Sequence, residues 1–523
     1  MAPAYDFVVV GSGFGGSVSA LRLAEKGYSV AVVERGRRFR SEDFPKTNWN
    51  LRKFLWAPQF GCYGIQAITL LKDVLVLHGT GVGGGSLVYA NTLLVPPQEV
   101  FGDPGWCRLG DWKRDLAPHY ERAQRMLGVV QARGQGEADR LLARVARELD
   151  PDAQPRATRV GVFFGEPGKT VPDPYFGGEG PARSGCTLCG GCMVGCRHGA
   201  KNTLDKNYLY LAERRGVRVI AETEVSEIRP AQDGYVLTTR RVTGLSSTNK
   251  GALRANSVVL AGGVLGTLPL LFRSKAAGGL ARLSDRLGDF VRTNSEAIVG
   301  FADGRKHVDH SRGIAIASGA DVLGTHFEMV RYGAGQDAMS VLGTLMVDAG
   351  APWPRALRLL GAALKHPLSF ARTFYPFGWA RRGAILLAMQ SLPNHLRLTP
   401  KSSWRWPFFT SLESVWATGA PVPKYFPAAH RVARRMAELT GGFAQSALPE
   451  VMLNLSTTAH ILGGCPMGEN AHQGVVDRHG RVFGYPNLYV ADGSVLPANL
   501  GVNPALTITA VAEWIMSQIP ARA

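Results

Sequence analysis

The sequence has no hydrophobic run long enough to cross a membrane. Its most apolar stretch, residues 257–272, spans 16 residues and is interrupted by three glycines and one proline. A transmembrane helix needs about 20 predominantly apolar residues, so this stretch is expected to be core. The first strand is expected from residue 7, with no secretory h-region or cleavage site before it. These features predict a cytoplasmic protein.

Acidic residues are absent from residues 349–412, where nine lysines and arginines supply half of the formal net charge of +18. Such a basic stretch could contact nucleic acid. Aliphatic side chains at helical spacing and many aromatic ones lie among the cations, which favours either a helix lying on an anionic membrane surface or a solvated helical hairpin. We therefore expect no nucleic-acid partner, and a location in the cytoplasm with or without peripheral contact to the membrane. The residues are Arg355, Arg358, Lys365, Arg372, Arg381, Arg382, Arg397, Lys401 and Arg405, with Trp353, Phe370, Phe374, Tyr375, Phe377, Trp379, Trp404 and Trp406.

The N-terminal stretch Phe7–Glu34 has the pattern of a dinucleotide-binding unit. A β-branched run is followed at once by Gly11-Ser-Gly-Phe-Gly-Gly16, a helical run, and a second strand that ends at Glu34. In such a unit the glycines permit a tight turn, close approach of a pyrophosphate, and packing of the helix on the strand. The helix N-terminus attracts the phosphates, and the acid accepts hydrogen bonds from ribose hydroxyls. The motif alone fits NAD and FAD equally.

A second glycine-rich loop, Gly79–Ser86, lies between an apolar strand at 74–77 and a helix-compatible run that ends at Asn91. Five glycines in seven residues let a flat or anionic ligand surface lie on the backbone. NAD enzymes have no evident need for such a loop, whereas a cofactor with an isoalloxazine ring has.

The C-terminal part carries a further set of signals. His460 is followed by Gly463-Gly464, and residues 487–492 read as a buried strand that ends in an exposed carboxylate, Asp492. A final helix is expected over 505–519, and Asn503 before Pro504 is a favourable N-cap arrangement.

Together these motifs resemble the glucose–methanol–choline (GMC) family of FAD oxidoreductases, and within it the bacterial cholesterol-oxidase branch. The matching blocks fall in the family's order along the whole chain: the Gly11–Gly16 turn with Glu34, Gly81-Val-Gly-Gly-Gly-Ser-Leu-Val88, His198-Gly-Ala-Lys-Asn-Thr-Leu-Asp-Lys206, Ala261-Gly-Gly263, His460-x-x-Gly-Gly464, Asn487–Asp492 and Gly501-Val-Asn-Pro504. The resemblance implies that the cofactor is FAD.

The resemblance also implies roles for individual residues. His460 would face the flavin and assist removal of the substrate hydroxyl proton, and Asn503 would contact flavin and substrate oxygen. Glu328 is the best match to the glutamate that shuttles a proton during isomerisation, although a solvated strand glutamate fits the sequence as well. The cofactor-binding residues expected from the motifs and the resemblance are Gly11, Gly13, Phe14, Gly15, Gly16, Glu34, Gly79, Gly81, Gly84, Gly85, Ser86, Asn91, Val225, Ala261, Gly262, Asp492 and Asn503.

Four of the seven cysteines occupy eleven residues with the spacing C-x2-C-x2-C-x3-C, at Cys186, Cys189, Cys192 and Cys196. This is the ferredoxin spacing, except that Arg197 replaces the proline that follows the fourth cysteine. These four cysteines, which we call the cysteine nest, lie closer together in the sequence than those of common zinc motifs. This spacing favours an iron–sulfur cluster of the 3Fe-4S or 4Fe-4S type. Cholesterol oxidase lacks these cysteines, whereas some bacterial glucose dehydrogenases of the wider family carry such a cluster. The alternative is a nest of reduced thiols or a disulfide pair.

We therefore expect an α/β protein with a Rossmann-like FAD-binding domain and a second α+β substrate domain that carries a mostly antiparallel sheet. The FAD domain would comprise residues 1–50, 75–125, 200–300 and 455–523, and the substrate domain residues 51–74, 126–199 and 301–454. The expected activity is FAD-dependent oxidation of a hydrophobic secondary alcohol such as a 3-hydroxysteroid, with electrons passing to an external acceptor or O2. The alternatives are oxidation of a long-chain or terpenoid alcohol, and a flavin and iron–sulfur electron carrier.

Overall fold

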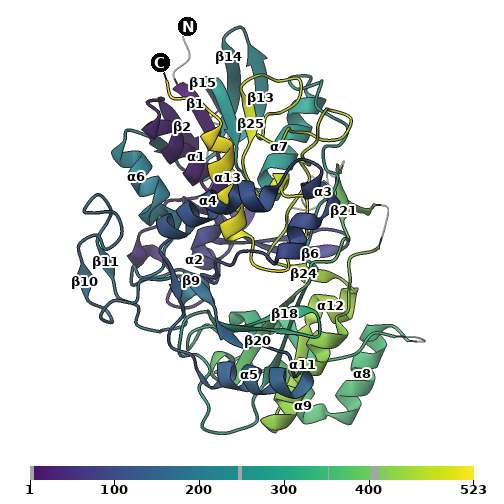
Figure 1. The fold of residues 1–523 in the computed structure, drawn as a ribbon. Coiled ribbons are helices and arrows are strands. Elements are labelled where there is room, and N and C mark those ends of the chain that lie inside the picture. Colours follow the sequence, from purple (N-terminus) through teal and green to yellow (C-terminus); the bar gives the residue numbers. More distant parts are fainter. Residues whose placement is uncertain (1–4, 245–249, 351–352, 402–411, 418–419, 523) are drawn as a thin grey trace.

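The fold is built on two large sheets, one in the upper and one in the lower half of the molecule as drawn in Figure 1. The structure is a computed structural model that describes residues 5–244, 250–350, 353–401, 412–417 and 420–522. Both chain ends emerge from the upper half, beside the first sheet (Figure 1). The upper half therefore contains the N-terminal and C-terminal motifs of the sequence together.

The upper sheet has a parallel centre, as the βαβ pattern at the N-terminus predicts. Its order is β12-β2-β1-β15-β14-β13, and β25 pairs with β15. The strands β12, β2, β1, β15 and β25 pair in parallel, whereas β14 and β13 continue the sheet as antiparallel strands. Their bounds are β1 Tyr5–Val10, β2 Val30–Val33, β12 Arg218–Ile220, β13 Thr223–Ala231, β14 Gly234–Arg241, β15 Lys250–Leu260 and β25 Leu488–Val490.

Helices cover this sheet and bury its apolar residues in the largest hydrophobic cluster of the molecule. Helix α1 packs against both α13 and α6, α13 packs against α4, and α7 packs on β13. The bounds are α1 Phe14–Glu25, α4 Trp112–Met126, α6 Tyr208–Arg214, α7 Val264–Ala276 and α13 Ala505–Ser517. The ends of the chain are thus held together by the contact between its first and last helices.

A small three-stranded sheet brings the second glycine loop beside the His460 segment. Its order is β24-β6-β5, with bounds β5 Gln66–Leu70, β6 Val74–Gly79 and β24 Ser456–Thr458. The parallel pairing of β24 with β6 places Thr458 opposite Val76. The glycine loop follows β6 and His460 follows β24. Because these strands are parallel, the two motifs leave the sheet at the same end.

The lower sheet is antiparallel throughout, with the order β19-β23-β16-β20-β18-β17-β8. Helices α5 and α11 pack on it and complete a second hydrophobic cluster. The bounds are β8 Arg156–Ala157, β16 Glu296–Ala302, β17 Ile316–Val322, β18 Thr325–Val330, β19 Gly343–Leu345, β20 Gly383–Met389, β23 Phe443–Ala447, α5 Glu137–Leu149, α11 Pro427–Leu439 and α12 Leu448–Leu453.

The predicted α/β class with a second, antiparallel sheet is confirmed, whereas the predicted domain boundaries stay a prediction. Within the described ranges, no helix combines the length and the apolar character that a membrane crossing requires. The remaining short elements are α2 Leu51–Phe54, β3 Trp56–Ala57, β4 Cys62–Tyr63, α3 Pro104–Cys107, β7 Val129–Gln131, β9 Arg159–Gly161, β10 Thr170–Val171, β11 Arg183–Ser184, α10 Trp379–Arg382, β21 Leu396–Pro400 and β22 Leu412–Trp416.

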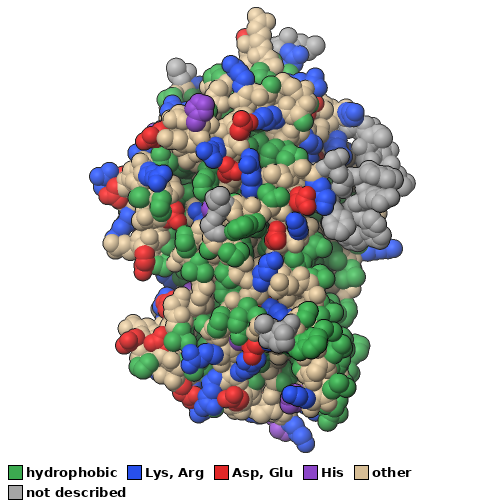
Figure 2. Space-filling model, turned by 90° about the vertical axis from the view of Figure 1, so that its right-hand side faces the viewer, with side chains coloured by type: hydrophobic (Ala, Val, Ile, Leu, Met, Phe, Trp, Pro, Cys, Tyr) green, Lys and Arg blue, Asp and Glu red, His purple; other side chains and the backbone are tan. Residues whose placement is uncertain are grey.

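The basic aromatic stretch forms two surface helices, α8 (Arg355–Lys365) and α9 (Pro367–Thr373), with apolar side chains turned outward. Leu364 is 84% exposed and Leu368 is 76% exposed. Hydrophobic side chains gather over the lower part of the face drawn in Figure 2. The exposed apolar members, which we call the α8–α9 face, are Leu357, Leu360, Leu364, Leu368, Phe374, Tyr375 and Phe377. Trp404, Arg405 and Trp406 lie outside the described residues.

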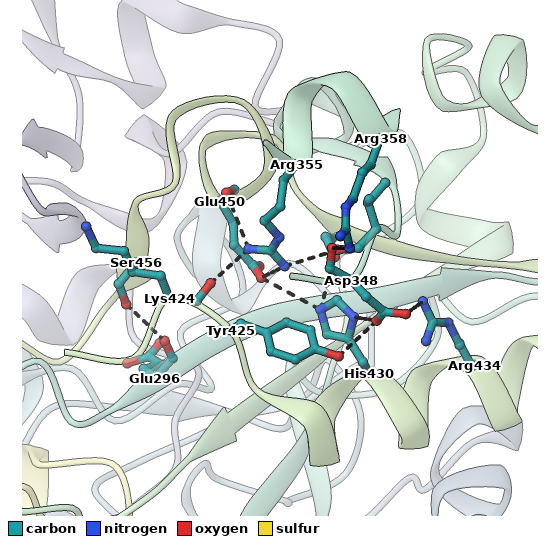
Figure 3. Close-up of polar contacts among 12 residues, drawn as sticks. Glu296, Asp348, Arg355, Arg358, Lys424, Tyr425, His430, Arg434, Glu450 and Ser456 are labelled. Atoms are coloured by element: carbon teal, nitrogen blue, oxygen red, sulfur yellow. Dashed lines mark hydrogen bonds and ion pairs between the residues drawn. The ribbon is translucent and has the colours of Figure 1, made fainter. Parts of the chain in front are cut away.

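One cation of this stretch is buried instead of exposed. Arg355 is 7% exposed, and its guanidinium donates to Glu450 Oε1 at 2.6 Å and to the Lys424 carbonyl at 2.8 Å. Figure 3 shows Arg355 and Glu450 within a polar network that also contains His430 and Asp348. The assignment of Arg355 to a solvated basic surface is therefore wrong. Its side chain instead fixes the start of α8 to the lower half of the molecule.

Candidate functional site

The turn between β1 and α1 has the close backbone contacts that its glycines permit. Gly11 has a φ of 102°, and a Cβ there would overlap the Ala261 carbonyl. A Cβ on Gly16 would overlap the Gly11 carbonyl, so the helix lies directly on the turn. Gly13, in contrast, faces open space, and no side chain caps the N-terminus of α1. The free N–H groups of this 12-residue helix are thus available to a phosphate.

Glu34 lies at the end of β2, 6% exposed, and already binds the turn. Its Oε2 accepts hydrogen bonds from the Ser12 hydroxyl at 2.7 Å and the Ser12 amide at 3.1 Å, and its Oε1 accepts from the Gly36 amide at 2.8 Å. An ionised carboxylate has about four acceptor positions, so one remains for a ribose hydroxyl. Val225 lies on β13, whose first residue, Thr223, donates to the Glu34 carbonyl at 2.9 Å. Val225 is therefore near the Glu34 end of the upper sheet.

The second glycine loop packs directly on the first. Ser12 Oγ accepts a hydrogen bond from the Gly83 amide at 3.1 Å and lies 3.2 Å from the Gly81 carbonyl, while its one proton is directed to the nearer Glu34 carboxylate. A Cβ on Gly84 would lie 2.6 Å from Gly13 Cα, so the two backbones touch. Ser86 is buried and joins this loop to Leu204 through its hydroxyl, at 3.0 Å.

Asn91, at the end of this loop, has the features of a ligand contact. It is fully buried in a left-handed conformation, with a φ of 73°. Neither atom of its side-chain amide bonds to a nitrogen or oxygen of the protein, and the neighbouring polar group is the thiol of Cys192. Buried amides are normally satisfied, so the donor and acceptor of Asn91 fit a bound polar group.

Asp492 is buried, 4% exposed, and the prediction of an exposed carboxylate is wrong. It accepts hydrogen bonds from Thr267 Oγ1 at 2.6 Å and from the Gly263 amide at 2.8 Å. Burial raises its pKa, although these hydrogen bonds act in the opposite direction. A Cβ on Gly15 would overlap the Ala491 carbonyl, so the end of β25 lies against the start of α1. Ala261 and Gly262 complete this junction beside Gly11.

His460 lies next to a buried carboxylate that the sequence motifs did not indicate. Its Nδ1 is 2.8 Å from Glu296 Oε2, and the Glu296 side chain is fully buried. Glu296 also accepts from Thr458 Oγ1 at 2.9 Å. Burial alone would lower the pKa of His460, but the negative charges of Glu296 and Glu328 outweigh burial and raise it. The imidazole and its carboxylate form the titratable centre of the site.

Asn503 and Glu328 come together from segments that lie 175 residues apart in the sequence. Asn503 Nδ2 donates to Glu328 Oε2 at 3.0 Å, and Glu328 is fully buried on β18. The alternative of a solvated strand glutamate is therefore wrong. The prediction of Asn503 as a helix N-cap is also wrong, because Pro504 occupies that position and no side chain caps α13. Asn503 Oδ1 and Glu328 Oε1 have no hydrogen-bond partner in the protein.

Asn294 holds the segments that carry these residues together. Its Nδ2 donates to the Val502 carbonyl at 3.0 Å, and its Oδ1 accepts from the Gly501 amide at 2.9 Å. Asn294 and Ser295 both have positive φ angles, 60° and 42°, immediately before Glu296. Strained backbone of this kind is common at functional sites. An acid at the start of an apolar strand was the only sequence signal for Glu296.

The four nest cysteines line one cavity of about 20 Å³, together with His198 and Lys201. All four are free thiols, so the disulfide alternative is wrong. In the described part of the chain, no three His, Cys, Asp or Glu side chains are arranged to hold a single metal ion. Lys201 Nζ donates to the Cys192 carbonyl at 2.8 Å and to the Leu87 carbonyl at 3.0 Å, which joins the nest to the second glycine loop.

Family models match three segments of the chain. The model of an FAD binding domain matches residues 6–49, and models of GMC oxidoreductase match residues 182–289 and 413–512. The chain is 44% identical to a cholesterol oxidase of Acinetobacter baumannii, over 99% of this chain and 95% of the relative. It is 48% identical to a cholesterol oxidase of Mycobacterium tuberculosis (strain ATCC 25618 / H37Rv), over 99% of this chain and 92% of the relative. A crystal structure of pyridoxine 4-oxidase from Mesorbium loti shares the fold, with a TM-score of 0.62, 15% identity and coverage of 98% of each chain.

Proposed function

The chain belongs to the GMC oxidoreductase family and is an FAD-dependent alcohol oxidoreductase, and we propose that its substrate is a 3-hydroxysterol, which it oxidises to the ketone. The observation that carries the proposal is the convergence of His460, Asn503 and Glu328, two of which have buried polar atoms without a partner in the protein. Identity of 44–48% to two cholesterol oxidases over nearly their full length supports the choice of a sterol.

The residues of the upper sheet fit FAD. The free N-terminus of α1 and the open space at Gly13 suit the pyrophosphate, and Glu34 has an acceptor position for the ribose. The buried amide of Asn91 suits the polar edge of a flavin. When bound, FAD supplies the acceptor of the hydride that leaves the carbinol carbon.

His460 is the group that takes the hydroxyl proton in this proposal. The ordinary pKa of an imidazole lies near neutral pH, which suits a general base. Glu296 fixes the ring and stabilises the positive charge that the ring acquires with the proton, because its carboxylate lies 2.8 Å from Nδ1. Asn503, held by Glu328, presents its free Oδ1 and orients a polar group of substrate or cofactor.

The first test of the function is anaerobic reduction of the bound flavin by candidate alcohols. Cholesterol dispersed in detergent is expected to bleach the oxidised flavin band and to yield one equivalent of ketone, and a long-chain primary alcohol is expected to do so at least about tenfold more slowly, because it lacks the ring system to fill a sterol site. Bleaching by the long-chain alcohol alone would overturn the sterol assignment. Absence of bleaching by every alcohol tested would revive the electron-carrier alternative.

We further propose that the cysteine nest holds an iron–sulfur cluster that passes electrons from the flavin to an external acceptor. A cluster takes one thiolate at each iron, so its cysteines need not converge on a single point. Two buried basic side chains adjoin the nest, Lys201 at 1% and Arg183 at 2% exposure, and their hydrogen bonds run to backbone carbonyls. Burial lowers the pKa of Lys201 to about 7, so a negative charge in the nest would favour its protonated form. Among the described residues neither cation has a carboxylate within ion-pair distance, so an anionic cluster would supply the missing negative charge. Without the cluster, O2 would be the acceptor.

The α8–α9 face supports a third proposal, contact with an anionic membrane from which the sterol is taken. Arg355 ties α8 to Glu450 (Figure 3), and Leu357, Leu360 and Leu364 of the same helix are exposed. Four exposed cations lie between residues 365 and 382, on or next to these helices: Lys365, Arg372, Arg381 and Arg382. Exposed apolar side chains beside cations are typical of segments that bind the interface of an anionic bilayer.

Replacing two leucines of this face by glutamate is expected to separate membrane contact from catalysis. The double variant Leu364→Glu and Leu368→Glu should bind vesicles of phosphatidylcholine and phosphatidylserine at least about tenfold more weakly, because each buried leucine contributes about 1.5–3 kcal/mol. Oxidation of vesicle-embedded cholesterol should fall accordingly, while oxidation of detergent-dispersed cholesterol should stay unchanged. Val130→Glu, at an exposed valine on β7, is the matched control. Equal vesicle binding by all three proteins would contradict the proposal.

A further inference from the structure

A histidine lies between the buried glutamate of the site and a carboxylate on the surface. His326 Nε2 is 3.6 Å from Glu328 Oε1, and His326 Nδ1 is 2.6 Å from Asp321 Oδ1. The side chain of Glu328 is fully buried, that of His326 is 6% exposed, and that of Asp321 is 55% exposed. The three groups therefore form a line of titratable atoms from the interior to solvent.

The strand geometry fixes this line. His326 and Glu328 are two residues apart on β18, so their side chains lie on the same face of the sheet. Asp321 lies on the neighbouring strand β17 and is paired in register with His326. A Cβ on Gly319, also on β17, would lie 3.3 Å from the imidazole, so the glycine leaves room for the ring. On the other side of β18, the residue in register with His326 is the apolar Met389 of β20.

Among the described residues, the charged groups that act on His326 are Asp321 and Glu328. Arg156 on β8 pairs with Asp321 Oδ2 at 2.7 Å, and the charge of Glu328 also acts on His460. Burial lowers the pKa of His326, but its hydrogen bond with Asp321 and the negative charges of Glu328 and Asp321 outweigh burial and raise it to about 9. Burial raises the pKa of Asp321, but His326 and Arg156 lower it to about 2. At neutral pH the ring therefore carries a proton on both nitrogens and Asp321 is ionised.

We propose that Glu328, His326 and Asp321 form a proton path that connects the active site with solvent. The inference rests on the proposed oxidation, in which the carbinol C–H bond gives up a hydride to the flavin and the O–H bond gives up a proton. Each oxidation thus leaves one proton in a buried site. Glu328 Oε1 has no hydrogen-bond partner in the protein and lies 3.6 Å from the imidazole of His326. The proton can therefore leave the site by way of Glu328 and His326.

The transfer balances in protons and bonds. A proton that reaches Glu328 neutralises its carboxylate and removes part of the attraction that keeps the ring charged. The ring then loses its Nδ1 proton through Asp321 to water, so one N–H bond breaks and one O–H bond forms. Rotation of the imidazole turns the deprotonated nitrogen toward Glu328, whose O–H proton restores the ring. His326 and Asp321 do not touch the substrate or the cofactor. They act on the reaction only through Glu328, by passing its proton to solvent.

The test is proton release during a single anaerobic turnover with cholesterol, followed with a soluble pH-indicator dye in weak buffer. In the wild-type holoenzyme, release of one proton is expected to coincide with bleaching of the flavin. In His326→Gln, bleaching should persist while proton release becomes at least about tenfold slower, because the imidazole step is missing. Added imidazole should restore release in His326→Ala, which a purely structural role of the ring would not allow.

A variant of the exposed end of the path, Asp321, tests the proposal without replacing a buried side chain. Asp321→Asn retains the size and a hydrogen-bond acceptor of an exposed side chain, and it should also delay proton release. Arg156→Gln removes the other partner of Asp321 but leaves the line intact, so its release should match the wild type within about twofold. Prompt release in both His326→Gln and Asp321→Asn would overturn the proton path. Absence of bleaching in the wild type would instead overturn the oxidation itself, so the two failures are distinguishable.

A second readout does not depend on turnover. Histidine side-chain NMR of the holoenzyme should show the signal of an imidazole that remains protonated up to about pH 9. This signal should be missing from the spectrum of His326→Gln. Its pKa should fall in Asp321→Asn and stay close to that of the wild type in Arg156→Gln. A His326 signal that loses its proton at the ordinary pH of histidine would contradict the charged ring on which the path depends.

Discussion

His460→Ala is expected to slow anaerobic flavin reduction by cholesterol about 10²- to 10⁴-fold, the usual contribution of a general base. The variant should still bind FAD, because the cofactor contacts proposed above lie on the glycine loops and around Asn91. Stopped-flow bleaching of the flavin measures the effect on the chemical step without interference from the electron acceptor. Reduction at the wild-type rate would show that another group takes the hydroxyl proton.

The pH dependence of the same reaction tests the partner of His460. A base must be neutral to accept a proton, and the pKa of His460 is raised by Glu296 and Glu328, so the rate is expected to rise with pH through that raised pKa. Glu296→Gln removes the nearer negative charge and should therefore lower the pKa of His460. The rise in rate should move to lower pH, with a smaller maximal rate because the imidazolium is less stabilised.

Glu450→Gln is the matched control for this change. It also removes a buried carboxylate from an ion pair, but at Arg355 in the lower half of the molecule. It should lower the unfolding temperature, because the buried guanidinium loses its counter-charge. The pH profile of flavin reduction should be unchanged. A shift of the profile in both variants would indicate general loosening of the fold and not a specific action of Glu296.

The parts that could be predicted from the sequence are those in which backbone geometry demands one residue type. Gly11 and Gly16 lie where a side chain would overlap a carbonyl. The glycine motif therefore predicts the close backbone contacts of the β1–α1 turn directly. The β-branched runs on either side of this turn likewise predicted β1 and β2 within a few residues. The second glycine loop was predicted for the same reason, since Gly84 touches the backbone at Gly13.

The parts that could not be predicted depend on contacts between distant segments. Glu296 is an ordinary acid in sequence, and only the pairing of β16 and β24 with their neighbours brings it to His460, 164 residues along the chain. Asn503 had the local pattern of an N-cap, yet tertiary contact with Glu328 takes its side chain. Arg355 was counted as a surface charge because the sequence does not show that Glu450 lies opposite it. Local patterns thus predict backbone conformation better than side-chain partners.

Replacing one cysteine of the nest is expected to abolish most of the electron transfer from the flavin to an external one-electron acceptor. If the nest holds a cluster, anaerobically purified protein should contain about three or four iron atoms per chain and absorb visible light beyond the flavin bands. In Cys192→Ala the iron and the additional absorbance should be lost. Flavin reduction by cholesterol should persist, because His460 and Asn503 are unchanged, whereas steady-state reduction of ferricyanide should fall at least about tenfold as the route through the cluster disappears.

Cys107→Ser separates this effect from the general loss of a thiol. Cys107 is free and exposed but lies on α3, outside the nest, so the variant should retain its iron, its spectrum and its activity with ferricyanide. The buried cations provide a further comparison, because Lys201→Met removes positive charge beside the nest without removing a thiol. It should lower the iron content or shift the cluster's reduction potential to more negative values, since an anionic cluster loses a compensating charge. Iron-free wild-type protein that reduces ferricyanide as fast as it reduces its flavin would show that the nest is a group of reduced thiols, and that electrons leave the flavin directly.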